Sequence, residues 1–247
     1  MDLYGLIGYP LDHSFSEKYF REKFIREGIM HTQYKAFPLS EIGLLKELLI
    51  EHPSLKGFNV TIPYKEKILT YLSGLSVGAQ VIGAVNTVII LRRSSTIELM
   101  GYNTDAYGFE KLLSSNFKTI ISALILGTGG AAKAVEFVLK QLNISYQFVS
   151  RNQLKNEVIS YGELNESHFR NIDLIINTTP LGQFPNLDQM PDIPIHLINE
   201  KHAVIDLIYN PKKTMLLKEA EKRGAFCING YQMLVEQAEE AWRIWNG

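Results

Sequence analysis

The segment Gly127-Thr-Gly-Gly-Ala-Ala132 constrains the fold of this 247-residue chain more than any other. It fits the pattern G-x-G-x-x-[G/A] and stands between an apolar run at 120–126 and a helix-compatible stretch at 133–140. This strand–turn–helix order is the context that the dinucleotide fingerprint requires. The glycines allow a tight turn and close approach of a pyrophosphate, which the N–H groups of the helix N-terminus can bind. Glycine turns also join strands and helices in proteins that bind nothing, so the flanks carry the prediction of nucleotide binding.

Composition narrows the class of protein. The net charge of −1 gives no reason to expect a nucleic-acid or membrane-surface partner. No apolar run approaches the ~18 residues that span a bilayer, and the N-terminus lacks a signal-peptide pattern. Cys227 is the only cysteine, and the six histidines show no metal-ligand spacing, so we expect a buried thiol and no metal. These features predict a cytoplasmic globular protein of one or two domains.

Short apolar runs alternate with helical patterns over the first hundred residues. This alternation predicts an α/β domain with a largely parallel sheet. The expected strands are 3–7, 33–37 and 57–62, and the expected helices are 17–27 and 42–52. A β-hairpin is expected from 84–91 and 96–102.

A second α/β unit is predicted to begin between Tyr102 and Tyr107. Its expected elements are a helix at 106–113, strands at 120–126, 146–149, 174–178 and 203–208, a loop at 183–194 and a helix at 231–245. The first two of these strands enclose the glycine turn and its helix in one βαβ unit. Two lobes with a nucleotide turn in the second predict a ligand cleft between them.

Polar residues of the first lobe cluster near the ends of expected strands, where open α/β sheets bind ligands. The sets are Ser14 with Ser16, Asn59 with Thr61 and Lys65, Asn86 with Thr87, and Asn103 with Asp105. Each set also has a purely structural interpretation, such as a capping box of Ser14 and Glu17, an N-cap at Asn103 or Asp105, or a solvated Lys65. Together they predict a pocket of hydroxyls and amides with one lysine and one carboxylate, suited to a small polyhydroxylated ligand.

One pair in this pocket carries a geometric expectation. Asn59 and Thr61 stand two residues apart, so on one strand they would face the same side. If that side is buried, their polar groups need partners, because a buried unpaired polar group costs about 1–3 kcal/mol.

The order of these motifs resembles the shikimate/quinate dehydrogenase family over nearly the whole chain. Ser14-Phe-Ser16 is similar to the family's Ser-x-Ser carboxylate site, and Asn59-Val-Thr-Ile-Pro-Tyr-Lys65 to its Asn-Val-Thr-x-Pro-x-Lys motif. The resemblance implies that Lys65 and Asp105 are catalytic. The substrate-binding residues that it implies are Ser14, Ser16, Asn59, Thr61, Lys65, Asn86, Asp105, Tyr209 and Gln237. Glu17 departs from the family, which usually has proline there.

The same resemblance implies where the cofactor binds. Segments 177–182 and 206–211 are similar to the family's loops beside the nicotinamide. The candidate cofactor residues are Gly127, Thr128, Gly129, Gly130, Ala131, Ser150, Arg151, Asn152, Lys155, Thr178, Thr179, Pro180 and Gly230. The implied domains are 1–102 plus 231–247 for substrate and catalysis, and 103–230 as a Rossmann domain.

Charge favours NADP(H) over NAD(H). An NAD site places an acidic residue about 20 residues after the glycines, where it binds the ribose 2′-hydroxyl. Ser150 stands there, 23 residues after Gly127, and Arg151 and Lys155 follow it. An arginine can pair bidentately with a 2′-phosphate. A solvated basic edge is the alternative interpretation of these two cations.

The expected reaction is NADPH-dependent reduction of 3-dehydroshikimate to shikimate, reversible, by a monomer or homodimer. The Lys65 ammonium can stabilise the charge that develops on the carbonyl oxygen and donate a proton to it. Asp105 can orient Lys65, and the sequence leaves open which of the two is formally the acid or base. Two alternatives also stay open: a related enzyme preferring NAD and quinate, and a non-catalytic nucleotide sensor of the same fold.

Overall fold

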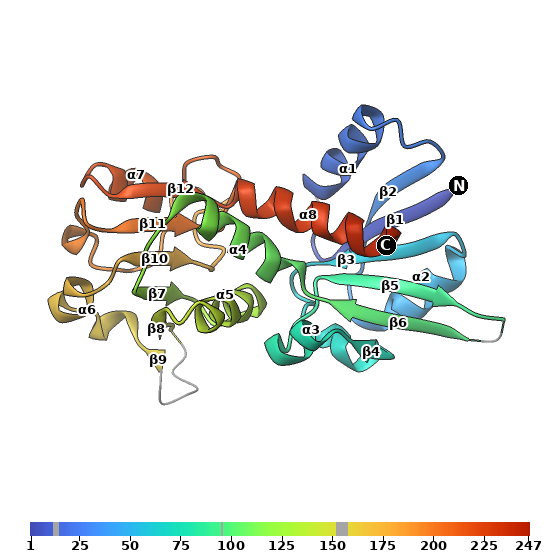
Figure 1. Ribbon diagram of the computed structural model, residues 1–247, viewed down its shortest axis with the longest axis horizontal. Helices are drawn as coiled ribbons and strands as arrows, with labels where there is room; N and C mark the ends of the chain where they lie inside the picture. Colours follow the sequence, from blue (N-terminus) through green and yellow to red (C-terminus); the bar gives the residue numbers. More distant parts are fainter. Residues whose placement is uncertain (12–14, 95, 152–157) are drawn as a thin grey trace. The chain divides into compact units, whose positions relative to one another are not determined.

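The computed structural model describes residues 1–11, 15–94, 96–151 and 158–247 (Figure 1). These residues form two compact units, one made of Met1–Thr104 with Ala238–Gly247 and the other of Asp105–Gln237. Each unit contains one six-stranded sheet with helices. The predicted α/β class is therefore confirmed in both.

The sheet of the first unit has the strand order β2-β1-β3-β5-β6-β4. Its strands are β1 (Asp2–Gly8), β2 (Thr32–Pro38), β3 (Leu55–Val60), β4 (Gly74–Leu75), β5 (Thr87–Arg92) and β6 (Ile97–Tyr102). β1 is parallel to β2 and β3, and β4 is parallel to β6, but β5 is antiparallel to both neighbours. The sheet is thus mixed rather than largely parallel, because the predicted hairpin β5–β6 joins it beside β3.

Helices cover both faces of this sheet. They are α1 (Phe15–Arg26), the 3₁₀ turn η1 (Ile42–Leu44) leading into α2 (Leu45–Glu51), η2 (Lys67–Tyr71), α3 (Val77–Ile82) and the C-terminal part of α8 (Tyr231–Asn246). On one face, α2 packs its leucines into a core with Phe58 and Ile68. On the other, α1 and α8 enclose an aromatic core in which Tyr4 stacks on Trp245 at 4.8 Å between ring centroids.

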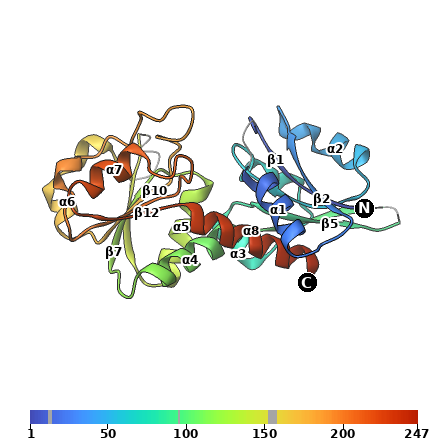
Figure 2. The same ribbon diagram turned by 90° about the horizontal axis from the view of Figure 1, so that it is seen from above.

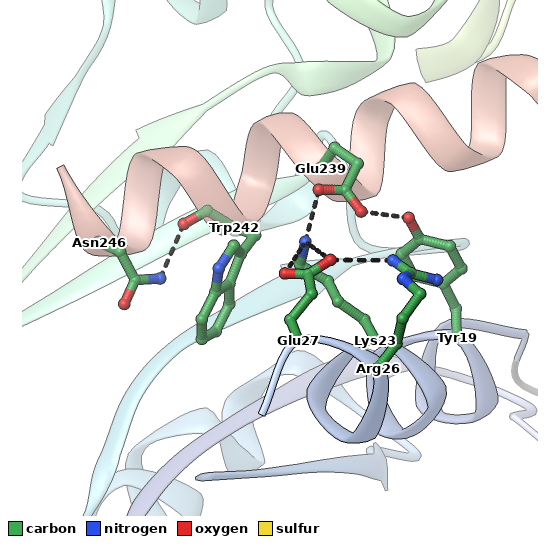
Figure 3. A network of polar contacts seen from close by, with 7 residues as sticks. All are labelled: Tyr19, Lys23, Arg26, Glu27, Glu239, Trp242 and Asn246. Atoms are coloured by element: carbon green, nitrogen blue, oxygen red, sulfur yellow. Dashed lines mark hydrogen bonds and ion pairs between the residues drawn. The ribbon is translucent and has the colours of Figure 1, made fainter. Parts of the chain in front are cut away.

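A charged cluster joins α1 to α8 at the edge of that aromatic core (Figure 3). Lys23 is 3% exposed, and its ammonium lies 2.6 Å from Glu239 and 2.8 Å from Glu27. The hydroxyl of Tyr19 also donates to Glu239, and burial raises the pKa of this tyrosine. A buried lysine requires such partners, because an uncompensated buried charge costs several kcal/mol. The cluster therefore fixes α1, the helix that carries Ser16, against α8 (Figure 2).

The second unit has an all-parallel sheet of order β12-β11-β10-β7-β8-β9. Its strands are β7 (Ser122–Leu126), β8 (Ser145–Val149), β9 (Val158–Ile159), β10 (Leu174–Asn177), β11 (Ala203–Asp206) and β12 (Phe226–Asn229). Counted from β7, this is the 3-2-1-4-5-6 order of a doubly wound dinucleotide-binding sheet. The predicted βαβ unit is confirmed as β7, the helix α5 (Gly130–Gln141) and β8.

The remaining helices of this unit surround its sheet. They are α4 (Thr104–Asn116), η3 (Tyr161–Glu163), α6 (Glu166–Arg170), η4 (Ile195–Leu197), α7 (Met215–Glu221) and the N-terminal part of α8. Four of the observed elements, β9, β12, α6 and α7, were not predicted from the sequence. These elements span two to seven residues, too few to show a clear period, and they form because longer neighbours pair with them or cover them.

Candidate active site

The candidate residues of the first unit emerge at one edge of its sheet. Register pairs Ile7 with Val60, Asn59 with Thr87, and Thr87 with Tyr102. The segments that follow β1, β3 and β6 therefore leave the sheet where β5 enters it. Sequence positions scattered between 9 and 105 are brought to this edge by the strand order alone.

Buried amide and hydroxyl groups hold this edge together. Here they are called the amide node: Tyr34, Asn59, Asn86, Thr87 and Thr104. The Tyr34 hydroxyl donates to Oδ1 of Asn59 at 2.8 Å. Nδ2 of Asn59 donates to the Asn86 carbonyl and to Oγ1 of Thr87, both at 3.1 Å. Both N–H groups of Asn59 are thus used inside the protein, which pins the loop before β5 to the end of β3.

The amide node also connects the backbones of the two candidate catalytic residues. Asn86 donates from Nδ2 to Oγ1 of Thr104 at 2.9 Å and accepts the Thr104 amide at 2.6 Å. Thr104 directly precedes Asp105, which is buried in the first turn of α4. On the other side, the amide of Val85 donates to the Lys65 carbonyl at 2.8 Å. Lys65 is therefore bonded through its own carbonyl to the residue before Asn86, and Asp105 directly follows a residue bonded to Asn86.

The segment that presents Lys65 has an anchor that the sequence analysis missed. Tyr64 is 3% exposed, its hydroxyl donates to the Leu39 carbonyl at 2.6 Å, and burial raises its pKa. Lys65 itself is half-buried. The predicted strand 57–62 is too long at this end, because β3 ends at Val60: the Thr61 amide still donates to the Ile7 carbonyl of β1 at 2.9 Å, but the Thr61 carbonyl accepts the Tyr64 amide of a turn, also at 2.9 Å.

Of the two candidate carboxylate-binding serines, Ser16 lies in the described part of the chain. Ser16 is the second residue of α1 and is half-buried. It lies beside the amide node, since burial raises the pKa of Tyr34 and a hydrogen-bonding interaction with Ser16 opposes that rise. Ser14, and with it the predicted capping box, lies outside the described residues.

In the second unit, five strands end in register. Val149, Leu126, Asn177, Asp206 and Asn229 form one row across β8, β7, β10, β11 and β12. Every described cofactor candidate follows one of these five strand ends. In doubly wound sheets the ligand binds at this carboxyl edge, beside the strand where the order reverses, which here is β7.

The glycine turn fits a dinucleotide. Gly127 has φ +107°, and a Cβ there would lie 2.7 Å from Oγ1 of Thr178, so a side chain is excluded on both grounds. Gly129 is the N-cap of α5 and has no side-chain capping bond, and a Cβ placed on it would meet nothing within 4 Å. Ala132, the third small position, is fully buried. An open, uncapped helix N-terminus of this kind suits a pyrophosphate.

The residues expected to select the cofactor follow β8. The Ser150 amide donates to the Ile159 carbonyl at 3.0 Å, and the next residue, Arg151, is exposed. The Arg151 charge opposes the rise in the pKa of Tyr161 that burial causes. Asn152 and Lys155 lie outside the described residues.

A second buried cluster holds the loops that follow β10 and β11. Here it is called the carboxylate node: Asn177, Thr179, Asp206 and Thr214. Asp206 is fully buried and accepts Nδ2 of Asn177 at 3.0 Å, the Ile208 amide at 3.1 Å and the Thr214 hydroxyl at 2.6 Å. Burial raises the pKa of Asp206 from 3.8 to about 6, and these three hydrogen bonds oppose the rise. No individual role was predicted for Asp206 or Asn177, which fall inside the predicted strands 203–208 and 174–178 and close the observed strands β11 and β10.

The last candidates lie on or beside α8. Gly108 of α4 allows α8 to approach closely. A Cβ on Gly108 would lie 2.5 Å from the Met233 carbonyl and 3.1 Å from the backbone nitrogen of Gln237. Gln237 thus lies about one helical turn from Asp105, and its Nε2 donates to the Leu234 carbonyl at 2.9 Å.

Two further candidates frame the loop after β11. Tyr209 is half-buried on this loop. Gly230 is buried directly after β12, and its amide donates to the Ile208 carbonyl at 3.2 Å. This bond ties the start of α8 to the loop that carries Tyr209.

Other classes of site receive no support from the described part of the chain. Among those residues, no helix is long and apolar enough to cross a bilayer, and no three His, Cys, Asp or Glu side chains gather as metal ligands. Cys227 is half-buried, donates weakly to the carbonyls of Leu217 and Ala225, and has a pKa raised by burial to about 11. A thiol with such a raised pKa is a poor nucleophile at neutral pH.

Known proteins resemble this chain along its whole length. The family model for the shikimate dehydrogenase substrate binding domain matches residues 6–88. A shikimate dehydrogenase (NADP(+)) of Methanococcus maripaludis is 40% identical over 99% of this chain and 92% of its own length. The crystal structure of shikimate 5-dehydrogenase from Thermus thermophilus, in complex with NADP(H) and shikimate, has a TM-score of 0.86 at 31% identity and covers 100% of this chain and 94% of that one. Quinate dehydrogenase from Corynebacterium glutamicum in complex with NAD has a TM-score of 0.84 at 28% identity over 100% of this chain and 94% of its own.

Proposed function

This chain belongs to the shikimate dehydrogenase family, and we propose that it catalyses the reversible, NADPH-dependent reduction of 3-dehydroshikimate to shikimate. The reaction is a step of the shikimate pathway to chorismate and the aromatic amino acids. The observation that carries the proposal is the amide node. It binds the loop around Asn86 to Thr104, the residue before Asp105, and the amide of Val85 in the same loop donates to the Lys65 carbonyl.

We propose that Lys65 is the proton donor of this reaction. When bound, NADPH supplies a hydride to the ring carbon that carries the ketone. The Lys65 ammonium stabilises the negative charge that develops on the carbonyl oxygen and donates a proton to that oxygen. Asp105 orients Lys65 and accepts a hydrogen bond from a ring hydroxyl. Both residues then act as one unit.

Apart from Lys65 and Asp105, the groups that hold the substrate in this proposal are neutral and polar. Ser14 and Ser16 bind the carboxylate, and the ring hydroxyls are bound by Thr61, Asn86, Tyr209 and Gln237. Asn59 takes a different role from the one that the resemblance implied. Because both of its N–H groups are donated within the protein, it positions the Asn86 loop. The first unit, with the last turns of α8, would be the substrate-binding domain.

The second unit would bind NADP(H) along the carboxyl edge of its sheet. The N-terminus of α5 would bind the pyrophosphate, through the amides of the turn Gly127–Ala131. Arg151, with Asn152 and Lys155, would bind the 2′-phosphate, and the absence of an acid at Ser150 removes the repulsion that an NAD site would impose. Thr178, Thr179, Pro180 and Gly230 belong to the loops on the other side of β7. The cytoplasm remains the proposed compartment, and a monomer or homodimer the proposed assembly.

A direct assay tests this function. Purified protein is given shikimate or quinate with NADP⁺ or NAD⁺, and reduction of the cofactor is followed by absorbance. We expect shikimate with NADP⁺ to give the highest kcat/KM. Equal use of quinate and NAD⁺ would favour the quinate enzyme, whereas binding of NADP⁺ without turnover of either substrate would favour a nucleotide sensor.

A further inference from the structure

Three segments of the second unit meet at the side chain of Asp206: the end of β10, the loop after β11 and the start of α7. Asp206 is the last residue of β11 and is 0% exposed. Its Oδ1 accepts two hydrogen bonds. One comes from Nδ2 of Asn177, the last residue of β10, and the other from the backbone amide of Ile208, in the loop after β11. Its Oδ2 accepts the hydroxyl of Thr214, which also N-caps α7.

The hydrogen bonds continue from this carboxylate into the candidate cofactor loop. Oδ1 of Asn177 accepts the amide of Thr179 at 3.0 Å and its hydroxyl at 2.7 Å. Since Nδ2 of Asn177 must point at Asp206, the amide cannot turn over without breaking the bonds to Thr179. The carboxylate therefore fixes the orientation of Asn177, and Asn177 fixes Thr179.

We propose that Asp206 is a positioning residue that, through Asn177 and Thr214, sets the conformation of the cofactor-binding loop Thr178–Pro180 and of the loop that carries Tyr209. This inference rests on the proposed function. Asp206 touches neither cofactor nor substrate in it. Its contribution is preorganisation, because a loop held in its binding conformation loses less entropy when the ligand binds.

The same sheet offers a matched control. Asp173 precedes β10, at the amino ends of the strands, and its carboxylate accepts the amides of Ile121 and Ser122 at 2.8 and 3.0 Å. It therefore also stabilises this sheet through backbone N–H groups, but at the edge opposite to the candidate cofactor loops. A purely structural role for Asp206 would make the two aspartates equivalent.

The test measures NADP⁺ affinity by calorimetry without substrate, together with thermal unfolding and the kinetics of shikimate oxidation. We expect Asp206→Ala to raise the Kd for NADP⁺ at least about fivefold. Asp206→Asn, which can still accept from Asn177 and Ile208, should restore most of that affinity. Asp173→Ala should lower the unfolding temperature and leave the Kd within about twofold of the unmodified value.

A milder pair of variants covers the case in which Asp206→Ala does not fold. Thr214→Val removes the 2.6 Å bond to Asp206 and should weaken NADP⁺ binding at least about twofold, whereas Thr214→Ser should not. Equal NADP⁺ affinity in the Asp206, Thr214 and Asp173 variants would overturn the positioning role. Unmodified protein that binds NADP⁺ but oxidises no shikimate would instead overturn the proposed function, and the affinity comparison would still stand.

Discussion

The two units hold their strand-end loops with chemically different groups. The amide node of the first unit joins neutral side chains, with Asn59 at its centre. The carboxylate node of the second unit is centred on Asp206, an acid whose burial raises its pKa to about 6. A neutral network keeps its hydrogen bonds at any pH near neutrality, whereas a buried acid makes its surroundings sensitive to protonation. The first unit thus has a framework that does not titrate near neutral pH, and the second unit has one that does.

The largest expected effect tests whether Lys65 of the first unit is the proton donor. Lys65→Ala should lower kcat at least about 100-fold, since that is the usual contribution of a general acid. NADP⁺ affinity should stay within about twofold, because no cofactor contact is removed. Steady-state kinetics and calorimetry measure the two quantities. Lys67→Ala, a change at an exposed lysine two residues on, is the control and should leave both unchanged. A Lys65→Ala protein with most of its turnover would remove Lys65 from the mechanism.

The converse change tests whether the second unit alone selects the cofactor. Arg151→Ala should raise the Kd for NADP⁺ more than about tenfold and that for NAD⁺ far less, because a charge-assisted hydrogen bond is worth about 1.5–3 kcal/mol. The kcat at saturating NADP⁺ should change little. Arg170→Ala removes another exposed arginine of this unit, paired with Glu166, and should alter neither affinity. Similar losses for NADP⁺ and NAD⁺ would contradict a role in 2′-phosphate binding.

A smaller effect should follow from a single atom removed from the amide node. Tyr34→Phe deletes the hydroxyl that donates to Asn59 and leaves the ring in its stack with Phe20. We expect the free energy of unfolding to fall by about 1–2 kcal/mol and the KM for shikimate to rise, with the Kd for NADP⁺ unchanged. Denaturant titration and kinetics measure these values. If NADP⁺ affinity fell as much as shikimate affinity, the amide node would not act on substrate binding alone, and the contrast with the carboxylate node would fail.

The smallest effect is a pH dependence that only the carboxylate node should show. The pKa of Asp206 is raised from 3.8 to about 6 on folding, so the folded protein binds more protons than the unfolded chain between these values. Its contribution to stability is therefore full below about pH 4 and is lost as the pH rises toward about 6. Asp206→Asn should remove a slope of up to about 1 kcal/mol per pH unit in that window. Tyr34→Phe should keep the slope, and an identical pH profile for both variants would contradict the assignment.

The sequence predicted those features of the candidate site that depend on short stretches of the chain. The strand–turn–helix order around Gly127 requires a βαβ unit, and β7, α5 and β8 form it. The positions of Lys65 and Arg151, one after β3 and one after β8, were also predicted, because hydrophobic runs mark strands and their polar ends mark loops. The mixed pairing of β5 and the short elements β12 and α7 were not predicted, since they depend on neighbours distant in the chain.

By itself, then, the sequence determined the fold class, the position of the glycine turn at Gly127 and the family of the chain. Only the tertiary structure decided what several polar residues do. From the sequence, Asn59 was predicted to bind the substrate, yet its side-chain N–H groups donate to Asn86 and Thr87. Asp206 falls in a predicted strand with no individual role, yet its carboxylate joins three segments. The physical reason is that side-chain hydrogen bonds inside a protein link residues far apart in the chain, and no local pattern records which partners the fold brings within about 3 Å.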